Sequence, residues 1–446
     1  MKKILLSLYI FSLTMTTQAQ SPAITSWLQN TTETGSYYMQ GNSTAIDNNI
    51  LYNCQKVEYS TDFVYITTKG IPAYTTGPFL DGNPSQATDQ DAIFKIPLSP
   101  QENSGTPIST NGGNIGVFVN GVALFDYRDG VAWNPNTNAL CGGPGNPPCP
   151  GGPMAQNDWN RDAVPAEMGG FDCSKAHPAM GNYHHHQNPS AFKLDLNVIS
   201  DICNLYDAEG LYAIDETEHS PLIGFAYDGF PIYGAYGFKN EDGTGGITRI
   251  KSSYQLQNIT TRTNGPDVSS TYFLGYFRED YEYVSHIEEN YLDEHNGRFC
   301  MTPEYPDGTY AYFATVDENW NSTYPYVVGP TFYGISENRK VNSVNETTTV
   351  YDGTSSLSET EFQNLNISIF PNPATDLIAI QIAGLVEEDL EIELVDLSGK
   401  IVSTSRISKG STIAYFDVQT IYDGIYIVKI SNDGLSISEK VVITKE

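Results

Sequence analysis

The sequence predicts a mainly β protein, and three observations lead to this fold class. The 446 residues include 30 Tyr, 39 Gly and 25 Pro; Tyr suits half-buried strands, whereas Gly and Pro suit turns. Long runs with a helical period of apolar residues are scarce. Short alternating runs bounded by turn residues are common. We therefore expect a β-rich domain with long loops, followed by a small C-terminal Ig-like β-sandwich.

The N-terminus is typical of a secretory signal peptide, which we place at residues 1–19. The chain starts with the basic tripeptide MKK, an apolar run follows over 4–15, and TQA at 17–19 places small residues before a cleavage site. A membrane anchor is the alternative, but the run is shorter than the about 20 residues that span a bilayer. We expect no transmembrane segment in the mature chain.

The chain is strongly acidic, with 53 Asp and Glu against 23 Lys and Arg and a formal net charge of −30 at pH 7. This charge repels nucleic acid phosphates and anionic lipid surfaces, so nucleic acid is excluded as a partner. The acidic residues are interpreted as a solvated surface, and calcium-binding acidic loops are the alternative.

The six cysteines are interpreted as disulfide formers, because an exported protein meets an oxidising compartment. Cys141 and Cys149 flank a short loop rich in Gly and Pro, which closes easily, so we pair them. The other four cysteines allow three pairings, among which the sequence does not decide: Cys54, Cys173, Cys203 and Cys300.

Residues 342–364 divide the chain into two parts. This stretch is polar and rich in Ser and Thr without an apolar period, which is typical of a linker. Over 365–446, short alternating runs are separated by turn signals at near-regular spacing, the pattern of a small β-sandwich.

The motifs of this second part are FPNPATD at 370–376, LSGK at 397–400, GIY at 424–426 and KVV at 440–442. Together they resemble the C-terminal sorting domain of the type IX secretion system of Bacteroidota. The resemblance implies the type IX machinery as a partner and translocation across the outer membrane. It further implies removal of the domain, with release or attachment to the cell surface. An ordinary Ig-like binding module is the alternative.

The region 21–341 is expected to hold the chemistry. Strands are predicted at 57–66 and at 114–120, the latter turning at Asn120-Gly121 into a partner strand at 122–125. Three of the seven histidines are consecutive in the segment GNYHHHQNP at 181–189. On a strand, His184 and His186 point to one face and His185 to the other.

Imidazoles at positions i and i+2 of a strand can chelate one ion, and neutral His binds Zn, Cu, Fe and Ni. We therefore predict a metal site at His184 and His186, with Cu or Zn as the cofactor. Further ligands must come from elsewhere in the chain, and His177, His219 and Asp228 are the first candidates, before His295 and Asp293. Two alternatives stand beside this hypothesis: a His face hydrogen-bonded among tyrosines, and an Asp228 that caps its own turn.

Several segments of the region resemble the YHYH-domain family, named for a Tyr-His-Tyr-His tetrad. The tetrad falls on residues 183–186, where His185 stands in place of the second Tyr. The blocks DGFPIYG at 228–234, LDEHNG at 292–297 and PDGTY at 306–310 also match, and the resemblance covers about 114–334. It implies a domain type rather than a reaction.

Familiar catalytic motifs are absent from the sequence, which contains no GxSxG, HExxH or GxxxxGK. The strand motif GTYAY at 308–312 is not followed by the Cys, His and Met ligands of a blue-copper site. Two hypotheses remain. One is a metal-dependent enzyme whose ion activates water or a substrate oxygen. The other is a non-catalytic extracellular binding or structural protein with calcium-stabilised acidic loops. An open coordination position would favour the enzyme.

Overall fold

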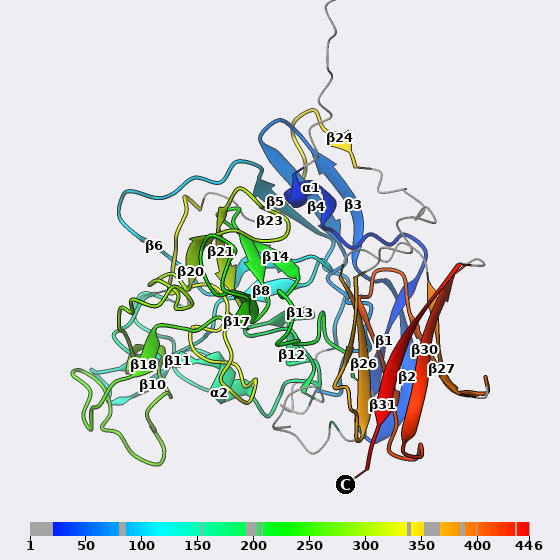
Figure 1. The fold of residues 1–446 in the computed structure, drawn as a ribbon. Helices are drawn as coiled ribbons and strands as arrows, with labels where there is room; N and C mark the ends of the chain where they lie inside the picture. The colour runs from blue at the N-terminus through cyan, green and yellow to red at the C-terminus, as the bar shows by residue number, and fades with distance from the viewer. Residues whose placement is uncertain are drawn as a thin grey trace, which may run out of the picture.

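The computed structural model describes residues 21–79, 86–152, 155–192, 203, 205–206, 208–336, 340–351, 366–383, 389–397, 399–432 and 435–445. The protein is mainly β, as predicted, and its helices are short (Figure 1): α1 Pro22–Thr25, α2 Ala163–Glu167 and the 3-10 helix η3 Arg278–Asp280. Within this part of the chain, no helix is both long and apolar enough to cross a membrane. The predicted signal peptide, 1–19, lies outside the described residues.

The central sheet has eight strands, and two of them carry His177, His184 and His185. In spatial order they are β12 Ala176–Ala179, β13 Asn182–His185, β8 Ala123–Phe125, β7 Asn114–Phe118, β14 Leu222–Ala226, β15 Pro231–Tyr233, β21 Thr309–Phe313 and β20 Gly297–Cys300. Aromatic side chains such as Phe118, Phe225 and Phe313 are fully buried along it. Their burial supplies much of the hydrophobic stabilisation, at about 25 cal/mol per Å² of apolar surface.

The hairpin predicted at Asn120-Gly121 is present and joins β7 to β8. Gly121 has φ +76, and a Cβ built on it would lie 2.3 Å from the Thr68 hydroxyl oxygen. Only glycine fits this turn, because a side chain would be strained by the backbone and would collide with the neighbouring sheet.

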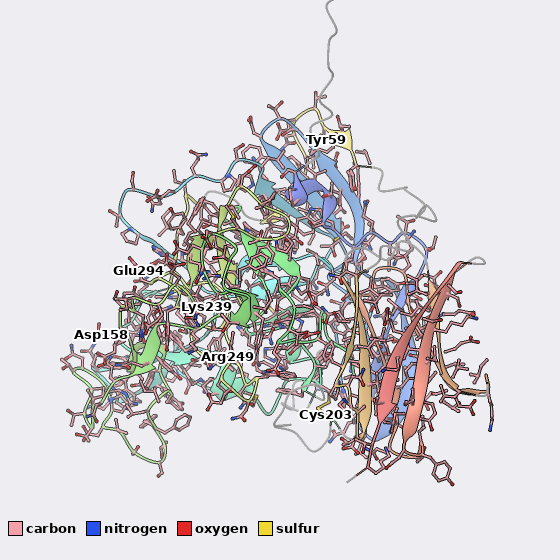
Figure 2. The ribbon with its side chains drawn as sticks, in the orientation of Figure 1. Tyr59, Asp158, Cys203, Lys239, Arg249 and Glu294 are labelled. Atoms are coloured by element: carbon pink, nitrogen blue, oxygen red, sulfur yellow. A yellow bond between two sulfur atoms is a disulfide. The ribbon has the colours of Figure 1, made fainter. Side chains whose placement is uncertain are left out.

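That neighbouring sheet has five strands, in the order β23 Lys340–Val341, β5 Ala92–Pro97, β4 Phe63–Thr68, β3 Cys54–Tyr59 and β24 Thr349–Val350. Strand β24 lies inside the stretch expected to be a linker, and its Thr349 pairs with Tyr59 of β3, which is labelled in Figure 2. The Thr348 hydroxyl also donates to Glu58 Oε2 at 2.5 Å. This segment is attached to β3 through backbone hydrogen bonds. The absence of an apolar period in the sequence therefore gave no sign that the segment pairs with the sheet. Most of the remaining linker, 352–364, lies outside the described residues.

Smaller sheets complete the N-terminal region. They are β1 Thr34–Met39 with β2 Asn42–Leu51; β10 Ala139–Cys141, β9 Arg128–Asn134 and β11 Asn160–Asp162; β16 Tyr236–Phe238 with β17 Ile247–Arg249; β18 Tyr254–Leu256 with β19 Tyr281–Tyr283; and β22 Thr331–Phe332 with β6 Ile108–Ser109.

Strand β11 runs directly into α2, whose N-cap is Asp162. The Asp162 carboxylate accepts from Val164 N at 2.9 Å and from the Tyr326 hydroxyl at 2.6 Å, which fixes the start of the helix.

The C-terminal part is a two-sheet β structure consistent with the predicted Ig-like sandwich. One sheet holds β25 Asn366–Phe370, β26 Leu377–Ala383 and β29 Ile413–Asp417; the other holds β28 Ile401–Ile407, β27 Leu390–Asp396, β30 Gly424–Asn432 and β31 Leu435–Ile443. The sandwich lies beside the β1–β2 hairpin (Figure 1). Asn53 Nδ2 donates to Gly410 O at 2.8 Å, and Ala213 N donates to Gln381 Oε1 at 3.0 Å. The sandwich therefore contacts the preceding region directly.

Two disulfides are present, Cys141–Cys149 and Cys173–Cys203. Cys54 and Cys300 are buried free thiols. The sequence-based default that all six cysteines form disulfides thus does not hold for these two, which lie on β3 and β20 in different sheets.

Candidate metal centre

The β12–β13 hairpin positions the histidines. Its two turn residues, Met180 with φ +49 and Gly181 with φ +85, both take the left-handed conformation of a primed two-residue turn. A Cβ on Gly181 would lie 2.1 Å from the Thr88 hydroxyl oxygen, so glycine is required there. This turn sets a register in which His177 pairs directly with His184.

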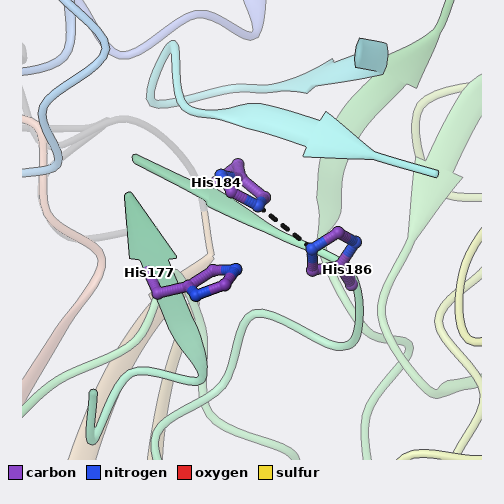
Figure 3. A group of neighbouring side chains, drawn as sticks. All are labelled: His177, His184 and His186. Carbon is purple, nitrogen blue, oxygen red and sulfur yellow. Dashed lines mark hydrogen bonds between the residues drawn. The ribbon is translucent and has the colours of Figure 1, made fainter. Parts of the chain in front are cut away.

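Three imidazoles share one face of the hairpin as a result. Directly opposite residues of an antiparallel pair point to the same side, and so do residues two apart on one strand. His177 therefore faces His184, and His186 follows just beyond the end of β13 (Figure 3). The ligand atoms that these three histidines offer all lie within 4.8 Å of one another. We call this set the histidine group.

The hydrogen bonds of the pair define its tautomers. His184 Nδ1 lies 2.8 Å from Asn182 O, and His186 Nδ1 lies 2.8 Å from Asp126 O. A carbonyl oxygen only accepts, so each Nδ1 must carry the proton. In the neutral rings each Nε2 then presents a lone pair. These two Nε2 atoms lie 3.0 Å apart, and two lone pairs at that distance need a cation or an extra proton between them.

A carboxylate that the sequence analysis did not identify reaches the same point. Glu167, the last residue of α2, places Oε2 3.1 Å from His177 Nε2 and 3.3 Å from His186 Nε2. Burial alone would raise the pKa of Glu167, but the contacts with His177 and His186 hold that pKa well below its usual range. The carboxyl group is therefore ionised.

Aromatic packing restrains the imidazoles. Phe125 stacks on His184 with ring centroids 3.8 Å apart, and Phe171 meets His177 edge-on at 4.9 Å. His184 is 1% exposed. Its burial, and after that its electrostatic interaction with His186 and His177, lowers its pKa well below the ordinary value. His184 is thus neutral, which is the form that binds metals.

The opposite face of β13 is built differently. His185 Nε2 lies 2.8 Å from the Tyr74 hydroxyl, and the ring of Phe118 meets it edge-on at 5.5 Å. Burial lowers the pKa of His185 to about 3. The hydroxyl of Tyr183, on the same face, donates to Asp172 Oδ2 at 2.9 Å. These contacts form a buried polar network that holds the hairpin against its neighbours.

The structure places His219 and Asp228 away from the histidine group. His219 donates from Nδ1 to Ser220 O at 2.8 Å and packs edge-on against Tyr233. Asp228 accepts from the Tyr312 hydroxyl at 2.5 Å, and it accepts from Gly334 N at 2.8 Å and Phe230 N at 3.3 Å, so it braces its own turn.

The two further candidates also have partners of their own. His295 Nδ1 lies 2.6 Å from the Thr331 hydroxyl, and Asp293 accepts from Tyr310 at 3.0 Å.

Two cavities among the described residues are lined by neither the histidine group nor Glu167. One, of about 760 Å³, lies between the β1–β2 hairpin and the sandwich, and Glu33, Asp389 and Arg406 are among its lining residues. The other, of about 30 Å³, is lined by His219 and Gln381 among others. The histidine group is therefore packed within the domain rather than exposed in either cavity.

Comparison with known proteins agrees with this organisation. The family model described as YHYH protein matches residues 93–326, more than half of the chain and the entire histidine group. The chain belongs to the YHYH family. A second model, the secretion system C-terminal sorting domain, matches 368–444. This YHYH protein therefore carries a sorting signal of the type IX secretion system, which indicates a secreted or cell-surface location.

No curated protein matches the chain. Among solved structures, the crystal structure of dimeric latent PorU from Porphyromonas gingivalis is similar with 17% identity and a TM-score of 0.16, over 18% of this chain. The chain spans 9% of that protein.

Proposed function

We propose that this YHYH protein binds a transition metal ion, Zn or Cu, through Nε2 of His184 and Nε2 of His186, with His177 as the third ligand. The observation that carries the proposal is the pair of Nε2 lone pairs 3.0 Å apart, each ring held by a carbonyl on its other nitrogen. Metal-binding imidazoles are commonly held in this way through the second nitrogen.

The spacing of the His184 and His186 nitrogens supports a transition metal. With metal–nitrogen bonds of about 2.0–2.1 Å, neighbouring ligands lie about 2.9 Å apart in an octahedron and about 3.3 Å apart in a tetrahedron. The 3.0 Å between His184 and His186 falls in this range. Calcium prefers oxygen ligands at about 2.3–2.6 Å, which three imidazoles do not supply.

The alternative function is a non-catalytic structural site, in which the ionised Glu167 balances the charge of a proton. One extra proton between His184 and His186, with Glu167 as counter-ion, would also hold the cluster together without a metal. Catalysis by the metal form requires a coordination position that an external ligand can reach.

In this proposal the two ends of the chain direct its delivery. The signal peptide at 1–19 directs export, the sorting domain at 365–446 engages the type IX machinery of a Bacteroidota cell, and the region 21–341 is the functional part. The segment 342–364 connects the two.

The test is elemental analysis of the mature protein, purified without chelators or a polyhistidine tag, followed by thermal unfolding with added Zn or Cu. We expect about one equivalent of transition metal and a higher Tm on adding it to metal-free protein. A protein that retains no transition metal and gains no stability would support the proton-sharing structural site instead.

A further inference from the structure

Three acceptor atoms converge at one point of the candidate centre. His186 Nε2 faces His184 Nε2 at 3.0 Å and Glu167 Oε2 at 3.3 Å. His186 Nδ1 faces the carbonyl oxygen of Asp126, so a ring that holds one proton carries it there and has no hydrogen on Nε2 to donate to the carboxylate. Glu167 Oε2 is buried, and apart from these imidazoles no group of the described residues donates to it. A buried carboxylate oxygen facing a nitrogen lone pair is repulsive unless a cation lies between them.

We infer that Glu167 is the fourth ligand of the proposed metal ion, which makes the centre a three-histidine, one-carboxylate site. This inference rests on the proposed function. The 3.1 Å and 3.3 Å from Oε2 to His177 and His186 fall in the range of about 2.9–3.3 Å expected between neighbouring ligands of one transition metal ion, so the carboxylate lies at ligand distance from two of the three imidazoles.

Charge balance favours this ligand. Three neutral imidazoles would leave a divalent ion with its full double charge in a buried place, which is costly. One carboxylate reduces the net charge of the centre to +1. The backbone of Glu167 is well placed for this role, because α2 is capped by Asp162 and that cap is bound by Tyr326 at 2.6 Å.

Glu167 is also the ligand that borders solvent. Its side chain is 25% exposed, whereas that of His186 is 4% exposed. It is the last residue of a five-residue helix, so its side chain can swing out without disturbing the hairpin. Displacement of this carboxylate is therefore the route by which an external oxygen- or nitrogen-donor ligand reaches the ion.

The experiment compares the wild-type chain with Glu167→Ala and Glu167→Gln, each loaded with Co²⁺ and titrated with azide while visible spectra are recorded. If Glu167 is a ligand, both variants bind Co²⁺ at least about tenfold more weakly. They also bind azide at lower concentration, because a coordination position has opened. Glu393→Ala is the matched control, since Glu393 is 24% exposed but pairs with Lys429 in the sandwich; it should behave as wild type.

The outcomes separate the inference from the function. Variants that keep wild-type Co²⁺ affinity and wild-type azide binding overturn the role of Glu167 and leave the histidine site standing. A wild-type chain that binds neither Co²⁺ nor Zn²⁺ overturns the metal proposal itself. Thermal unfolding of the metal-free variants checks folding, and Glu167→Gln, which keeps the size of the side chain, decides the question if Glu167→Ala does not fold.

Discussion

His177 lies directly opposite His184 across the β12–β13 ladder, and this pairing brings a third imidazole to the pair formed by His184 and His186. His177 belongs neither to the family tetrad at 183–186 nor to the run of three consecutive histidines. Its position follows from a turn at Met180 and Gly181 that both strands share.

Changing both His184 and His186 to Ala should abolish transition-metal binding. At a free metal concentration of 100 times Kd, wild type should gain about 2.7 kcal/mol of stability over its metal-free form, and the double variant almost none. Comparing each protein with its own metal-free form removes the cost of the altered core. Calcium held by acidic loops would persist in the double variant, and equal metal-dependent stabilisation of both proteins would contradict the site.

Changing His185 to Ala should lower stability but leave metal binding intact, the reverse of the double variant. The side chain is buried on the far face of β13, so its loss leaves a cavity and an unpaired Tyr74 hydroxyl. We expect the free energy of unfolding to fall by about 2–4 kcal/mol. Metal affinity, measured by titration at a temperature where the variant is folded, should change little. A loss of metal equal to that of the double variant would mean that both faces serve the ion.

The pH dependence of stability should depend on His219. Its burial lowers its pKa to about 4, whereas the unfolded chain has the ordinary value of about 6.5. Between these values the unfolded chain binds a proton that the folded chain does not, so stability falls as the pH falls from about 6.5 toward 4. We expect the free energy of unfolding, measured by urea titration, to fall less steeply with decreasing pH in His219→Asn than in wild type. The difference in slope should be up to roughly 1.4 kcal/mol per pH unit. Parallel curves for the two proteins would show that His219 does not titrate in this way.

A chain ending at Tyr351 should lose surface delivery but keep its metal site. The contacts of His184 and His186 come from residues between Phe125 and His186, and the sandwich supplies none of them. The lost contacts include four hydrogen bonds, worth about 1 kcal/mol each, and the buried packing of Ala213 against Ile413 and Tyr415, so the free energy of unfolding should fall by several kcal/mol while the chain stays folded. Fractionation, metal titration and thermal unfolding check the three parts, and a collapse of stability would mean that the two regions form one folding unit.

Local pattern was enough for the fold class and for part of the site. Alternation and turn residues predicted the hairpin at Asn120-Gly121, and the motifs at 370–442 predicted the sorting domain that the family model matches. The two-residue period of a strand placed His184 and His186 together, because side chains two apart always share a face.

Only the tertiary structure decided which other groups join them. His177, His219 and Asp228 were equivalent candidates in the sequence, yet the hairpin register brings His177 to the pair, while Asp228 is held by Tyr312 and Gly334. The sequence around Glu167 contains no motif that would have identified it as a metal ligand. The physical reason is that a coordination sphere depends on distances between segments, and those are set by turn conformation and long-range packing, which a one-dimensional pattern does not contain.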